Sequence, residues 1–131
     1  MSGRPLPAWA DDPLSTFLSA ADYNERVSAL KMPEVYALLQ SAHAGFQHVL
    51  GLTGNDRDPN LVPTRLLMAR THSAWLAAVR LALSGQTVES YPALRAVIEN
   101  AWYALHLAKD PVPPGRAEMW LRRAEGDEAR K

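Results

Sequence analysis

The stretch from residue 91 to residue 109, YPALRAVIENAWYALHLAK, decides the fold class. Apolar side chains recur in it at steps of four, three, four and three residues. This is the spacing of one face of an α-helix that packs in a bundle. The residues that carry the spacing are Leu94, Ile98, Ala101, Leu105 and Ala108. The pattern predicts a long helix whose apolar seam faces the core.

Helical periodicity returns in other segments, which are separated by Pro and Gly. A short amphipathic helix is expected to begin at Pro13, because Asp12 is a good N-cap and Pro suits the first turn. Long helices are expected over residues 33–52 and 64–84, the second ending at Gly85, a common C-terminal stop. Their expected core positions are Val35, Leu38, Leu39, Ala42, Phe46, Val49 and Leu50 in the first, and Leu67, Met68, Ala74, Trp75, Ala78, Val79, Leu81 and Ala82 in the second.

The sequence therefore predicts an all-α fold, an antiparallel helical bundle of four main helices plus a short N-terminal helix. The connections are short, so successive helices should pack as antiparallel neighbours. We expect an extended N-terminal arm over residues 1–12, the bundle over 13–125 and a charged tail over 126–131. A last helix carries Trp120, which either docks on the bundle, pairs with a second subunit, or belongs to a longer protein of which this chain is a piece.

Composition excludes several classes of function. The 14 basic and 14 acidic side chains balance, whereas a general polyanion binder usually has a clear basic excess. The absence of Cys excludes disulfides, zinc fingers and iron–sulfur clusters. No segment is long and apolar enough to cross a bilayer, so we expect no membrane partner and a cytoplasmic location.

A polar row accompanies the apolar seam of residues 91–109. Its members Arg95, Glu99, Trp102 and His106 follow one another at steps of four, three and four, about 100° round the helix from the seam. One interpretation is a ligand or polar site, with Glu99 as a base, His106 as an acid or ligand, and Arg95 holding an anion. The other is an intrahelical pair between Arg95 and Glu99, with His106 near the helix C-terminus.

Metal and cofactor sites are not expected. Di-iron bundles need repeated Glu-x-x-His pairs, and Glu99 is followed three residues later by Trp102. His43 and His48 are five residues apart, so they point to different faces of their helix. The four Trp are expected to serve as core and interface anchors.

A second pair, Arg65 and His72, lies on one face of the helix over residues 64–84. Antiparallel packing of that helix on the next one would bring His72 within reach of Glu99. An Arg and a His separated by six residues within an all-helical bundle resemble the motif of the HEPN ribonuclease superfamily. The resemblance implies that Arg65 and His72 face each other across a dimer and cut RNA without a metal. Position 66 is Leu, where the family often has a polar residue.

Residues 66–110 are also similar to uncharacterised bacterial helical proteins in which a long helix leads into one with Arg-x-x-x-Glu, here Arg95 and Glu99. This similarity supplies no activity. Two hypotheses of function follow. The first is a helical interaction domain that self-associates as a homo-oligomer, with no convergent polar pocket. The alternative is a HEPN-like, metal-independent ribonuclease with Arg65 and His72 as catalytic residues, the only case in which nucleic acid is a partner.

Overall fold

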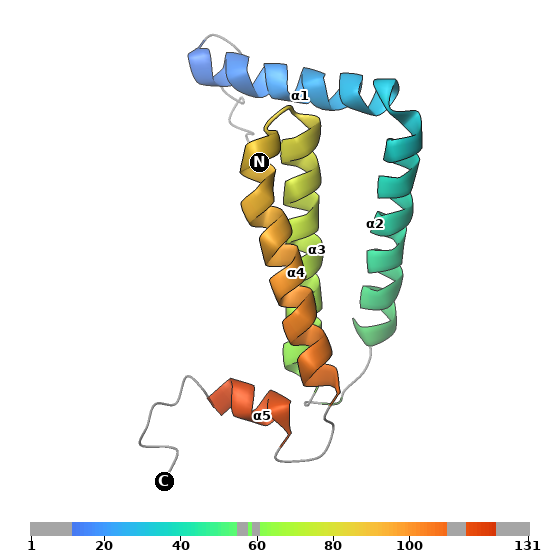
Figure 1. The fold of residues 1–131 in the computed structure, drawn as a ribbon, viewed down its shortest axis with the longest axis vertical. Coiled ribbons are helices and arrows are strands. Elements are labelled where there is room, and N and C mark those ends of the chain that lie inside the picture. Colours follow the sequence, from blue (N-terminus) through green and yellow to red (C-terminus); the bar gives the residue numbers. More distant parts are fainter. Residues whose placement is uncertain (1–11, 55–57, 59–60, 110–114, 123–131) are drawn as a thin grey trace, which may run out of the picture.

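The computed structural model describes residues 12–54, 58, 61–109 and 115–122. They form five helices, α1 (Pro13–Lys31), α2 (Pro33–Gly54), α3 (Val62–Leu83), α4 (Thr87–Ala108) and α5 (Arg116–Leu121). Helices α2, α3 and α4 run along the long axis, α1 crosses one end and α5 lies at the other (Figure 1). The all-α prediction is confirmed. The arm over 1–12 and the tail over 126–131 lie outside the described residues, apart from Asp12.

Helix α1 begins where the sequence predicts. Asp12 is extended, and its Oδ1 accepts from the backbone N–H groups of Leu14 and Ser15 at 2.9 and 3.0 Å. The helix is 19 residues long, so the prediction of a short one was wrong. Its second half is held by polar contacts rather than by an apolar stripe. Ser28 Oγ donates to the Leu83 carbonyl at 2.9 Å, and Asn24 Nδ2 donates to the Ser84 carbonyl at 3.3 Å.

Helices α3 and α4 form a tight antiparallel hairpin and share most of the contacts between helices. The turn between them needs Gly85, whose φ of 93° is a left-handed conformation that other residues rarely adopt. The N–H of Gln86 donates to the Leu81 carbonyl at 2.8 Å and satisfies a carbonyl at the end of α3. The predicted stop at Gly85 is confirmed.

Small side chains line the contact between the two helices. Thr71 and Ala78 of α3 and Ser90 and Ala104 of α4 are all buried. At the far end from the turn, Leu67, Ala104 and Leu107 form an apolar cluster. Trp120 of α5 packs on this cluster, so the last helix docks on the bundle. That helix is only six residues long, so it is not one of four main helices.

The seam predicted on α4 does not face the core of the chain. Four of its five members are exposed, namely Leu94, Ile98, Leu105 and Ala108, and Ala101 is half-buried. The buried positions stand one residue earlier: Ala104 precedes Leu105 and Leu107 precedes Ala108. One residue is about 100° of rotation round a helix. Helix α4 therefore turns Ser90, Ala104 and Leu107 toward the core, and Leu94, Ile98 and Leu105 face outward. It also begins at Thr87, four residues before the expected start, with Pro92 inside it.

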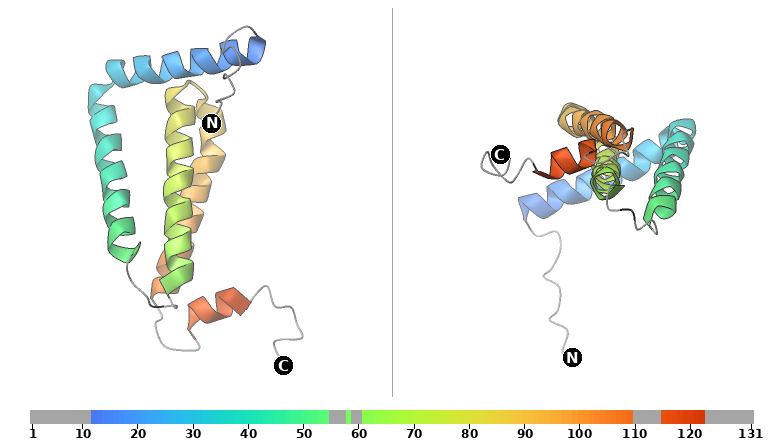
Figure 2. Two further views of the ribbon diagram at one scale, coloured as in Figure 1. Left: turned by 180° about the vertical axis from the view of Figure 1, so that it is seen from behind. Right: turned by 90° about the horizontal axis from the view of Figure 1, so that it is seen from below.

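The predicted core faces of the other long helices are partly confirmed. On α3, Leu67 and Ala78 are buried and the other expected positions are half-buried, except Ala82, which is exposed. On α2 the expected stripe divides. Its half-buried members are Leu39, Phe46 and Leu50, and its exposed members are Val35, Leu38, Ala42 and Val49. Helix α2 packs mainly on α3, and the view from below shows α2 and α4 on different sides of α3 (Figure 2).

Candidate functional site

The polar row on α4 is present as a row, but its side chains have separate surroundings. Arg95 Nε and Glu99 Oε1 form the predicted intrahelical ion pair at 2.7 Å. The hydrogen bond to Glu99 and its negative charge raise the pKa of the Arg95 guanidinium above its usual value. Trp102 and His106 are exposed further along the helix. The ion pair and the position of His106 in the last turn match the structural interpretation of the row.

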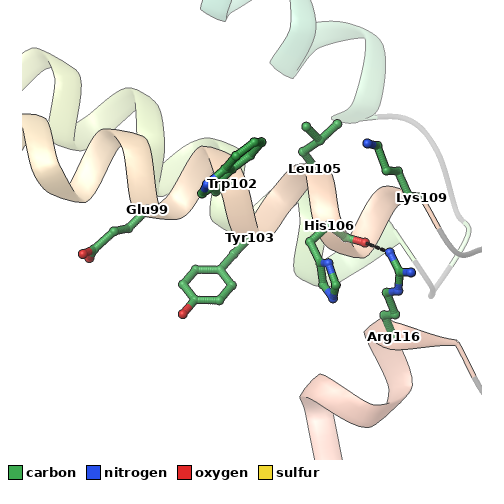
Figure 3. Close-up of a pocket in the computed structure, with 7 residues that line it drawn as sticks. All are labelled: Glu99, Trp102, Tyr103, Leu105, His106, Lys109 and Arg116. Atoms are coloured by element: carbon green, nitrogen blue, oxygen red, sulfur yellow. Dashed lines mark hydrogen bonds between the residues drawn. The ribbon is translucent and has the colours of Figure 1, made fainter.

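Three members of the row line an open surface pocket of about 680 Å³ at the C-terminal end of α4. Its lining consists of Glu99, Trp102, Tyr103, Leu105, His106, Lys109 and Arg116. Trp102, Leu105 and Lys109 project from one side of α4, whereas Glu99, Tyr103 and His106 project from the other (Figure 3). The polar groups do not converge on one point.

Sequence reasoning missed Tyr103, Lys109 and Arg116 as neighbours of this row. The expected helix over residues 91–109 already contained both Tyr103 and Lys109. Tyr103 lies between Trp102 and His106 of the polar row, and Lys109 lies three residues after His106. Arg116 belongs to α5, and its Nη1 donates to the backbone carbonyl of His106 at 3.2 Å. No pattern in the sequence sets how α5 lies against α4, so this contact had no signal.

Arg65 and His72 lie on α3 with different partners. Arg65 Nη2 donates to the backbone carbonyl of Asp58 at 2.9 Å. Its Nε is buried and has no hydrogen-bond partner among the residues that the structure describes. The side chain of Arg65 is thus directed to Asp58, and this hydrogen bond links Asp58 to α3.

His72 faces α2. Its Nε2 lies 3.0 Å from Nδ1 of His43, and its ring stacks on Phe46 with centroids 5.1 Å apart. Trp75 completes this aromatic cluster, with its ring centroid 5.6 Å from that of Phe46. Burial and, to a smaller extent, the charge of His43 lower the pKa of His72 below its usual value. A hydrogen bond between two imidazoles needs one ring to be neutral, which agrees with this direction.

The structure does not bring His72 and Glu99 together, because His72 contacts α2 while Glu99 pairs with Arg95 on the exposed side of α4. The ribonuclease hypothesis stays a prediction, since it needs a second copy to place His72 opposite Arg65. His43, the actual partner of His72, was considered only as a partner of His48. Its spacing from Leu39 and Phe46, four residues before and three after, was the signal that it faces α3.

A second feature of α4 is an apolar stripe on its outer side. Its members are Tyr91, Leu94, Ile98, Trp102 and Leu105. Each is between 41% and 70% exposed. All five lie within about 80° of arc on the helix surface. Monomeric soluble proteins rarely expose contiguous apolar patches of this kind, so the stripe is a candidate interface.

Within the described ranges, no three His, Asp or Glu side chains are grouped so that they could hold a metal ion. Likewise, none of the described helices is both long and apolar enough to cross a membrane. Comparison with known proteins finds no matching family model, no matching curated protein and no matching solved structure.

Proposed function

We propose that this chain is a self-associating helical interaction domain and that the outer face of α4 is its contact surface. One observation carries the proposal. The largest apolar side chains of α4 have the spacing of a bundle seam, and they are exposed in the single chain. A helix with such a seam is stable when a neighbouring helix covers it.

The energetics of burial support pairing. Among the described residues, the buried apolar side chains are Pro63, Leu67, Ala78, Ala104 and Leu107. Covering one large apolar side chain contributes about 1.5–3 kcal/mol. The five side chains of the stripe therefore offer a second copy a gain comparable to the cost of association, about 4–15 kcal/mol.

The arrangement of the polar groups also favours binding over catalysis. A hydrolytic site needs a base and its orienting partner within hydrogen-bond reach of one reacting atom. Glu99 and His106, the two groups proposed for acid–base work, are exposed on α4, and Glu99 is already bonded to Arg95. This is the distribution expected of a protein surface that contacts another protein.

Size-exclusion chromatography with light scattering tests the proposal. The wild-type chain should have twice the mass of one chain at micromolar concentration. Ile98→Arg places a charge in the middle of the stripe and should raise the dissociation constant at least about tenfold. The matched control is Leu66→Arg on α3, because Leu66 is 56% exposed and lies on the side of α3 away from both α4 and α2.

The control variant should keep the mass and stability of the wild type. A wild-type chain that remains monomeric at concentrations well above micromolar overturns the proposal. Equal weakening by Leu66→Arg and Ile98→Arg would also overturn it, because association would then not depend on α4.

A further inference from the structure

We infer that two copies dock through α4 of each, antiparallel, about a twofold axis that passes beside Ile98. This inference rests on the proposed self-association and specifies its geometry. It names the register of the interface and the residues that meet across it.

The spacing of the stripe carries the inference. From Tyr91 to Leu105 the steps are three, four, four and three residues, so the pattern reads the same in both directions. A twofold interface requires that if one residue contacts another, the reverse contact also forms. With Ile98 at the centre, Ile98 meets Ile98 of the second copy. Leu94 then meets Trp102, and Tyr91 meets Leu105.

All of these positions are free to make the contacts. The five side chains are exposed, and none of them belongs to the buried face of α4, which consists of Ser90, Ala104 and Leu107. Each pairing places an apolar side chain against another one. The large Trp102 meets the smaller Leu94, which suits interdigitation of side chains between two helices.

The pocket at the end of α4 fits the same register. Tyr91 of the second copy, opposite Leu105, would enter the side of the pocket from which Trp102, Leu105 and Lys109 project (Figure 3). A phenol ring has an apolar body and a polar tip, and this side has apolar walls and an ammonium group. The pocket is thus the receiving surface for the N-terminal half of α4 of the other copy.

The chain has no Cys, which makes a clean crosslinking test possible. Ile98→Cys brings two thiols together at the twofold axis, so mild oxidation should convert most of the protein to a disulfide-linked dimer. The control Leu66→Cys is also at an exposed position, 56% against 65% for Ile98, but it lies on α3, away from the axis, and should remain uncrosslinked. Both variants are at exposed positions and should fold as the wild type does.

Two further variants fix the direction. Leu94→Cys and Trp102→Cys should not crosslink alone. In the antiparallel register each residue is about 12 Å along the helix axis from the same residue of the second copy. A mixture of the two should crosslink efficiently. In a parallel pairing the result is reversed: each variant crosslinks alone and the mixture yields no mixed dimer.

The outcomes separate the two proposals. A wild-type chain that is monomeric by light scattering overturns both the proposed function and this geometry. A wild-type dimer in which Ile98→Cys does not crosslink, or in which Leu94→Cys crosslinks alone, overturns the geometry and leaves self-association standing.

Discussion

The α3–α4 hairpin and helix α2 differ in the size of the side chains with which they pack. In the hairpin, Ala78 and Ala104 are buried, and the two helix backbones approach closely around them. Helix α2 meets α3 through the bulky rings of His43 and Phe46, which rest on His72 and Trp75. The hairpin has the more extensive contact.

This difference shows which apolar side chains a helix pair buries. Where both helices offer small side chains, they pack on that face and leave larger ones outside. Ile98 on α4 is left outside in this way and is 65% exposed. On α2, where aromatic rings make the contact with α3, Leu38 is 69% exposed. Burial in the single chain therefore follows the fit between two helices rather than the hydrophobicity of each residue.

The largest effect should come from shortening a side chain in the apolar cluster of Leu67, Ala104 and Leu107. Leu107→Ala should lower the free energy of unfolding by about 2–5 kcal/mol, because it removes buried contacts and leaves a cavity. Leu38→Ala, the same substitution on the exposed side of α2, should change it by less than about 0.5 kcal/mol. Urea unfolding at one protein concentration measures both. Equal losses of the free energy of unfolding in the two variants would contradict the view that the packing of the α3–α4 hairpin stabilises the fold more than the exposed side of α2 does.

A smaller pair of effects should have opposite signs in the two regions. Gly85→Ala in the hairpin turn should destabilise by about 1–3 kcal/mol, because alanine is strained at a φ of 93°. Gly45→Ala in α2 should stabilise by about 0.5–1 kcal/mol, because the residue is helical and a Cβ there meets nothing within 4 Å. Thermal unfolding of the two variants checks the signs. A stabilising Gly85→Ala would disprove the left-handed turn.

The sequence predicted local features better than the rotation of each helix. Asp12 and Gly85 act through their own backbone and neighbouring N–H groups, so the pattern alone placed both helix ends. The predicted inward face of α4 was displaced by one residue from the face that is buried in the structure. The periodicity of Leu94 and Leu105 shows that they share a face, but not whether that face meets α3 or a different partner.

The site shows the same division. The Arg95–Glu99 pair is local and was predicted. The contact of His72 with His43 joins residues from two helices, and it depends on the register between α2 and α3. The length of α1 depends on carbonyls at the end of α3, which accept from Ser28 and Asn24. No periodic pattern in α1 encodes these acceptors.

The smallest effect should appear when the pH is lowered, and it should be confined to the contact of α2. Burial and the charge of His43 lower the pKa of His72 in the folded chain, while in the unfolded chain it stays near about 6.5. Between these two pKa values the unfolded state binds more protons. The free energy of unfolding should therefore fall as the pH drops through about 6.5 toward the folded pKa.

The charged group that shares the face of His72 on α3 is Arg65, two turns away. Unfolding at pH 7.5 and pH 5.5 should show the loss in the wild type and a smaller loss in His72→Gln. His48→Gln, at an exposed position of α2, should behave as the wild type. Amide exchange should place the acid-induced loosening in α2 and leave the hairpin protected, because the hairpin contact contains no imidazole. Loosening of α3 and α4 to the same degree would show that the two regions are not held independently.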